Sequence, residues 1–117
     1  MSAVRIYHNP RCSKSRQALA LLQARGEEIE VIDYIEDQLS NAEISDLLKQ
    51  LGMRARDLMR SGEDSYKELK LGNPDLSEAQ LVQAMADYPR LIERPIVVYN
   101  GRALVARPPE RIEELFA

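Results

Sequence analysis

Cys12 is the side chain of this 117-residue sequence best suited to nucleophilic chemistry, because the chain holds no other cysteine. It stands between a strand-like apolar segment, Ala3–Tyr7, and a helical pattern that begins at Ser13. A helix N-terminus presents free backbone N–H groups and the positive end of the helix dipole, and both stabilise a thiolate. His8, the only histidine, lies in the intervening turn and would add favourable charge when protonated. We therefore expect a reactive thiolate; the alternative is a small, buried Cys12 beside a structural His8.

The residue types around Cys12 restrict the chemistry that a thiolate could perform. Ser15 takes the place of the second cysteine of a Cys-x-x-Cys oxidoreductase, so no disulfide can close within this loop. Redox chemistry at Cys12 then needs an external thiol. We expect Ser15 to donate a hydrogen bond to the thiolate or to cap the helix. Arg11 and Lys14 either add positive charge to the site or point into solvent.

A second group of chemically suggestive residues follows from a β-hairpin near the C-terminus. Asn100-Gly101 between two apolar runs predicts a two-residue type I′ turn. In that register Arg94 lies opposite Arg107, where Cβ atoms are about 4.5–5.5 Å apart. Two guanidinium groups so close favour an oxyanion between them. The alternative is a ladder that frays before Arg94 and leaves both side chains in solvent.

Each of these arginines precedes a proline, in Arg94-Pro95 and Arg107-Pro108. A following proline favours extended backbone at the residue before it, which would fix the direction of each arginine. Pro95, just before the predicted strand Ile96–Tyr99, is a candidate for a cis peptide bond.

The elements that position these residues are predicted in the order β-α-β, helices, β-β-α. A helix that begins at Ser13 and is closed by Gly26 leads to a strand over Ile29–Ile35. Because this helix is a crossover connection, the strands before and after it are parallel. Capping boxes at Ser40 and Ser77 begin helices in the intervening block, and Pro108 precedes a short C-terminal helix. The order is typical of one α/β, thioredoxin-like domain over residues 1–117. Its sheet is mixed and four-stranded, with a helical insertion at about residues 40–88.

The composition bounds the class of protein. The chain is 44% hydrophobic and 30% charged, with a net charge of −3, which is typical of a globular domain and not of a disordered or nucleic-acid-coating protein. No apolar run is long enough to span a bilayer, and no signal-peptide pattern begins the sequence. We expect a cytoplasmic protein with no metal site and no bound cofactor, and with no nucleic-acid or membrane partner.

Several segments together resemble the glutaredoxin-dependent arsenate reductases. The loop Tyr7-His8-Asn9-Pro10-Arg11-Cys12-Ser13-Lys14-Ser15-Arg16 resembles their active-site loop. Ala55–Arg60 resembles the segment with their first substrate arginine; Ile92–Val98 and Ala106–Pro108 resemble those with the other two. The match is collinear over essentially the whole chain. Taken alone, Arg60 would be only a positive charge at the end of a helical segment.

The resemblance implies a function and a mechanism. The thiolate of Cys12 would attack the arsenic of arsenate, which Arg60, Arg94 and Arg107 would bind. Glutathione, as co-substrate, would then join the arsenic, glutaredoxin would supply the electrons, and arsenite would leave. His8 is implied to favour the thiolate form of Cys12.

Two other functions remain open on the sequence. The first is a glutathione-linked thiol oxidoreductase with another substrate on the same fold. The second is a binding protein like the Spx-type regulators, which share this fold and contact RNA polymerase. Those regulators usually carry a Cys-x-x-Cys switch, and Ser15 removes it here.

Overall fold

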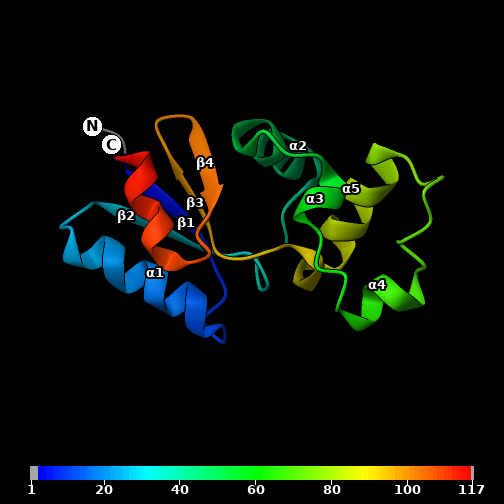
Figure 1. Cartoon of the computed structure of the whole chain (residues 1–117), viewed down its shortest axis with the longest axis horizontal. Coiled ribbons are helices and arrows are strands. Elements are labelled where there is room, and N and C mark those ends of the chain that lie inside the picture. Colours follow the sequence, from blue (N-terminus) through cyan, green and yellow to red (C-terminus); the bar gives the residue numbers. More distant parts are fainter. Residues whose placement is uncertain (1–2, 117) are drawn as a thin grey trace. The chain divides into compact units, whose positions relative to one another are not determined.

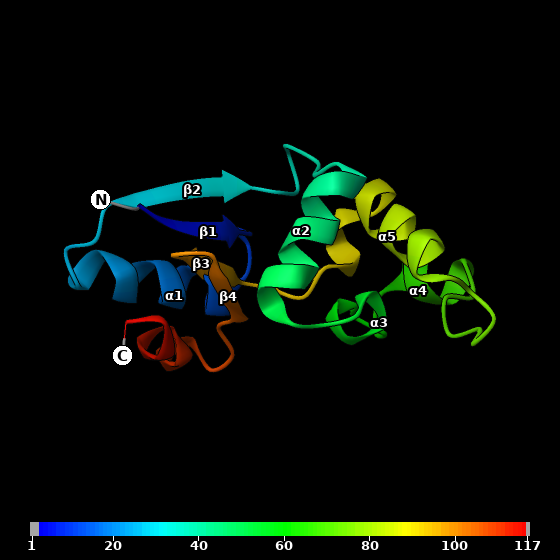
Figure 2. The same ribbon diagram turned by 90° about the horizontal axis from the view of Figure 1, so that it is seen from above.

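The computed structural model describes residues 3–116 of the chain (Figures 1 and 2). The described elements, in chain order, are β1 (Val4–His8), α1 (Ser13–Ala24), β2 (Ile29–Asp33), α2 (Asn41–Leu51), α3 (Ala55–Leu58), α4 (Asp64–Glu68), α5 (Glu78–Asp87), the 3₁₀ helix η1 (Pro89–Leu91), β3 (Ile96–Tyr99), β4 (Arg102–Val105) and the 3₁₀ helix η2 (Pro109–Leu115). They form two compact units. Unit 1 runs up to Asp37 and resumes at Arg94, and unit 2 is Gln38–Glu93. The insertion expected at about 40–88 lies within unit 2.

Unit 1 contains a mixed four-stranded sheet, as predicted, and its strand order is β2-β1-β3-β4. β1 and β2 are parallel, whereas β3 is antiparallel to both β1 and β4. Tyr99 pairs with Arg102, and Ile96 pairs with Val105, which is the register counted from the turn. Asn100 and Gly101 have φ values of 53° and 76°, as a type I′ turn requires at both central positions.

One face of this sheet packs against both helices of unit 1. Its buried cluster draws side chains from all but one strand and from both helices: Val4, Ile6, Ala18, Leu22, Val97, Leu104, Ala106, Ile112 and Leu115. α1 and η2 contact each other on this face (Figure 2). Burial of one such aliphatic side chain stabilises a fold by about 1.5–3 kcal/mol. The cluster therefore fixes α1, and with it the Cys12 position at its N-terminus, against β1.

Two helices of unit 2, α2 and α5, begin where the sequence predicted. At α2, Ser40 Oγ accepts a hydrogen bond from Glu43 N and Ser40 N donates to Glu43 Oε1, both at 3.1 Å. Ser77 and Gln80 form the same capping box at α5. These reciprocal bonds satisfy backbone N–H groups that a helix start leaves unpaired. The two helices pack together through their buried aliphatic faces.

Some elements differ from the prediction. The C-terminal helix is 3₁₀ rather than α, since its buried residues, Pro109, Ile112 and Leu115, recur every third position, which aligns them in a 3₁₀ helix. The helical segment expected over Arg54–Arg60 ends at Leu58, because Met59 is extended and forms an antiparallel bridge with Ile92. None of the helices described in residues 3–116 is long and apolar enough to cross a membrane.

Candidate active site

The loop between β1 and α1 is held by four hydrogen bonds. Asn9 supplies three of them: its carbonyl accepts from Cys12 N at 2.9 Å, its Oδ1 accepts from Arg11 N at 3.0 Å, and its N–H donates to Ser15 Oγ at 3.0 Å. The guanidinium of Arg16 adds the fourth, to Pro10 O at 2.8 Å. Asn9 and Arg16 were not assigned a role from the sequence. The loop is therefore an ordered support for Cys12.

Cys12 occupies the N-cap position of α1, with extended backbone at φ −96° and ψ 122°. Its side chain is partly exposed and makes no capping hydrogen bond, and the first turn of α1 contains no acidic residue. The N–H groups of a first helical turn have no partner within the helix, and they attract anions. The structure thus places a partly exposed Cys12 at the N-terminus of α1, as the sequence predicted, and not in the core.

His8 and Ser15 form a buried pair behind the loop. His8 is 7% exposed, Ser15 is fully buried, and Nδ1 of His8 lies 2.7 Å from Ser15 Oγ. The hydroxyl also accepts the bond from Asn9 N. Neither expected role of Ser15 is present: within residues 3–116 it neither caps α1 nor bonds to Cys12 Sγ. Ser15 instead ties the last residue of β1 to the first turn of α1.

The environment of His8 disfavours its charged form. Burial lowers its pKa below the ordinary value of 6.5, Asp33 on the neighbouring strand acts in the opposite direction, and Arg16 lowers the pKa further. A positive charge on His8 that stabilises the thiolate is therefore disfavoured at neutral pH. The geometry gives His8 a positioning role, exerted through Ser15 on the loop.

His8 is expected to titrate below pH 6.5, because its burial penalises the imidazolium. The unfolded chain then takes up the proton first as the pH falls, so the contribution of a neutral His8 to stability is complete above about pH 6.5 and is lost below it. Since the chain has one histidine, a single imidazole signal in the NMR spectrum reports this titration.

The matching stability measurement compares urea unfolding of the wild type and His8→Asn at pH 8 and pH 5. Between pH 8 and pH 5 the free energy of unfolding should fall more in the wild type than in His8→Asn, because His8 is the only titrating group in which the two proteins differ. A midpoint at or above 6.5, or equal losses in the two proteins, would contradict the assignment.

Arg94 and Arg107 lie at the same end of the sheet as the Cys12 loop. β1 ends at His8 and leads into that loop, and β3 begins with Ile96 opposite Tyr7 (Figure 1). Arg94 precedes β3, and Arg107 follows β4, which ends opposite the start of β3. Antiparallel pairing therefore brings both arginines to the carboxyl end of β1.

The two arginines are also close to each other. Nη1 of Arg107 donates to the carbonyl of Arg94 at 3.0 Å, and Ala106 N donates to Pro95 O at 2.9 Å, one bond beyond the assigned strand pairs. Regular pairing ends at Ile96, so the ladder stops before Arg94, as the alternative expected, but the contact between Arg107 and the Arg94 carbonyl keeps the two residues close. The Arg94–Pro95 bond is cis, as predicted, and the Arg107–Pro108 bond, for which no prediction was made, is also cis.

Arg60 lies in unit 2, beyond the end of α3, and is not the helix-terminal charge that its local sequence suggested. Its N–H donates to Leu91 O at 2.8 Å, and its guanidinium pairs with Glu63 at 2.9 Å and Glu93 at 3.5 Å. Nothing in the sequence pattern indicated these two partners, which come from segments before and after α5.

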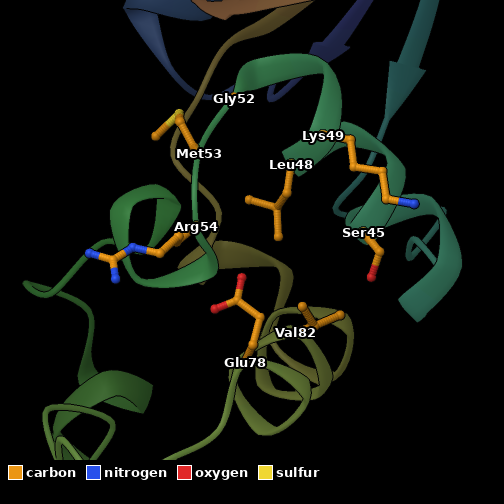
Figure 3. A pocket seen from close by; sticks show the side chains of 8 residues that line it. All are labelled: Ser45, Leu48, Lys49, Gly52, Met53, Arg54, Glu78 and Val82. Atoms are coloured by element: carbon orange, nitrogen blue, oxygen red, sulfur yellow. The ribbon is translucent and has the colours of Figure 1, made fainter.

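A cavity of about 450 Å³ in unit 2 is lined by none of the predicted site residues. Leu48 and Val82 converge on it, whereas the charged ends of Lys49 and Arg54 extend away from it (Figure 3). The Glu78 carboxylate accepts a hydrogen bond from Ala55 N at 2.8 Å, which satisfies the start of α3. We assign no ligand to this cavity. Within residues 3–116, no cluster of His, Cys, Asp and Glu side chains is arranged to hold a metal ion.

Comparison with known proteins identifies the family. Residues 7–115 match the ArsC family, from the end of β1 through η2. The chain belongs to the ArsC family. The match includes the Cys12 loop and all three arginines that the sequence singled out.

Individual proteins resemble the chain over nearly its full length. It is 58% identical to the uncharacterized protein YfgD of Escherichia coli (strain K12), covering 96% of this chain and 95% of that one. It is 50% identical to an arsenate reductase of Neisseria meningitidis (strain Z2491), covering 97% of each. The structure of an arsenate reductase from Vibrio cholerae superposes with a TM-score of 0.94 at 52% identity, covering 97% of each chain. The fold is therefore thioredoxin-like, as this family's is.

Proposed function

We propose that this protein reduces arsenate to arsenite, with Cys12 as the nucleophile and with glutathione and glutaredoxin as the source of electrons. The observation that carries the proposal is a partly exposed cysteine at an uncapped helix N-terminus, in a chain without a second cysteine. Relatives that are 50% and 52% identical over 97% of the chain and are named arsenate reductases support arsenate as the substrate. We expect the reaction to take place in the cytoplasm.

The first step follows from the position of Cys12. Its thiolate attacks arsenic(V), forming a sulfur–arsenic bond while a protonated arsenate oxygen leaves as water. The N–H groups of the first turn of α1 and the guanidinium groups of Arg94 and Arg107 supply positive potential at this end of the sheet. We assign Arg60 to the oxyanion as well, on the family resemblance alone.

The reduction requires two electrons that Cys12 cannot supply alone. Glutathione replaces a second oxygen on arsenic, again with loss of water. The thiol of glutaredoxin then attacks the glutathione sulfur, so the sulfur–arsenic bond breaks and its electron pair reduces arsenic(V) to arsenic(III). Hydrolysis of the remaining bond returns the Cys12 thiol and arsenite. A further glutathione resolves the mixed disulfide, so one arsenate and two glutathione molecules give one arsenite, one glutathione disulfide and one water.

A coupled assay tests the proposal. The purified protein, arsenate, glutathione, glutaredoxin, glutathione reductase and NADPH should together oxidise NADPH at a rate that depends on every component. Omission of glutathione or glutaredoxin should return the rate to the blank. A rate independent of arsenate, with turnover of mixed disulfides instead, would show a thiol oxidoreductase of another substrate.

A further inference from the structure

Arg60 is fixed at its backbone by a short antiparallel pairing inside unit 2. Met59 bridges to Ile92, Arg60 N donates to Leu91 O at 2.8 Å, and Glu93 N donates to Leu58 O at 2.9 Å. This pairing joins the segment after α3 to the segment after η1. It brings Glu93 near Arg60, although the two are far apart in the sequence.

Two carboxylates then meet the guanidinium of Arg60 at different N–H groups. Nη1 donates to Glu63 Oε1 at 2.9 Å, and Nε lies 3.5 Å from Glu93 Oε1. The three side chains are only 26%, 28% and 31% exposed, so water screens their charges less than it would on an open surface. The guanidinium of Arg60 is thus paired with two carboxylates.

This arrangement matters for any anion that binds Arg60. A guanidinium has five N–H donors, so an oxyanion can share it with two carboxylates. The carboxylates nevertheless repel the oxyanion and draw on the same positive charge. Pairing with two carboxylates should therefore weaken the binding of an anion by Arg60.

We infer that Glu63 and Glu93 are positioning residues that orient Arg60 and compete with the oxyanion for it. The inference rests on the proposed role of Arg60 in arsenate binding. It adds that Glu63 and Glu93 limit the affinity of that binding. Removing either charge while keeping the hydrogen-bond acceptor strengthens oxyanion binding at Arg60. Glu63 has the larger effect, because its contact is shorter.

The test uses Glu63→Gln and Glu93→Gln, with Glu68→Gln as a control. Glu68 is an exposed residue of α4, the helix that begins next to Glu63, so its substitution makes the same change in net charge. Each substitution is made in the Cys12→Ser background, which lacks the nucleophile. Arsenate is titrated against the Nε–Hε NMR signal of Arg60, assigned by its disappearance in Arg60→Lys.

The arsenate dissociation constant should fall about three- to tenfold in Glu63→Gln, fall less in Glu93→Gln and stay unchanged in Glu68→Gln. A higher constant in Glu63→Gln and Glu93→Gln would show that the acids only position Arg60, and an unchanged constant would show no competition; either overturns the inference. An Arg60 signal that ignores arsenate in every variant also overturns it. Because binding is read without turnover, failure of arsenate reduction in the coupled assay would be seen separately.

Discussion

Replacing Cys12 with serine is expected to lower kcat/KM for arsenate reduction by at least about 1,000-fold, because removal of a nucleophile eliminates the covalent step. The measurement is the coupled assay with wild type and Cys12→Ser at equal concentration. The fold should be retained, since Cys12 is an N-cap and serine is preferred at that position. The free energy of unfolding should therefore be unchanged or higher by up to about 1 kcal/mol.

Ser13→Ala provides the matched control for this substitution. Ser13 is the exposed neighbour of Cys12 in the same helical turn, and its hydroxyl is not part of the proposed chemistry. Its variant should keep the wild-type rate within about threefold. Substantial arsenate reduction by Cys12→Ser would show that Cys12 is not the nucleophile.

Replacing Arg107 with alanine is expected to raise the KM for arsenate by about 10- to 100-fold, which corresponds to about 1.4–2.8 kcal/mol of lost binding. Arg107 is exposed, and its guanidinium contacts the backbone carbonyl of Arg94. Its replacement should therefore remove an anion-binding group without disturbing the hydrophobic core. The KM of Arg107→Lys should lie between those of the wild type and Arg107→Ala, because lysine keeps the charge but loses the forked geometry.

Arg102→Ala distinguishes a local effect from a change in net charge. Arg102 is an exposed arginine of the same hairpin, next to the turn and so at the opposite end from Arg107. Its variant should leave KM within about twofold of wild type. An Arg107→Ala protein that is unfolded by circular dichroism, or that binds arsenate normally, would contradict an anion-binding role.

Structural elements that are determined by residues close together in the sequence could be predicted from it. Asn100-Gly101 fixed the hairpin register because both residues tolerate positive φ, and register then follows by counting. Ser40 and Ser77 marked the starts of α2 and α5 because a capping box closes within one turn. The place of Cys12 between β1 and α1 followed from the same kind of local pattern.

Features that depend on contacts between distant segments were not predictable. The Met59–Ile92 bridge ends the expected helical segment early, and the glutamates that flank Arg60 come from two separate segments. The bond from His8 to Ser15 depends on how α1 packs behind β1. The sequence pattern does not show such contacts. It therefore left His8 able to carry a favourable charge when protonated, whereas its burial in the structure lowers its pKa and disfavours that charge.

Direct measurement of arsenite is the sharpest test of the central claim that Cys12 reduces arsenate. Arsenite and NADPH oxidation are quantified in the same coupled reaction, with wild type and Cys12→Ser compared. The account predicts equimolar arsenite and oxidised NADPH for the wild type and neither above blank for Cys12→Ser. NADPH oxidation without arsenite, or equal arsenite from both proteins, would contradict it.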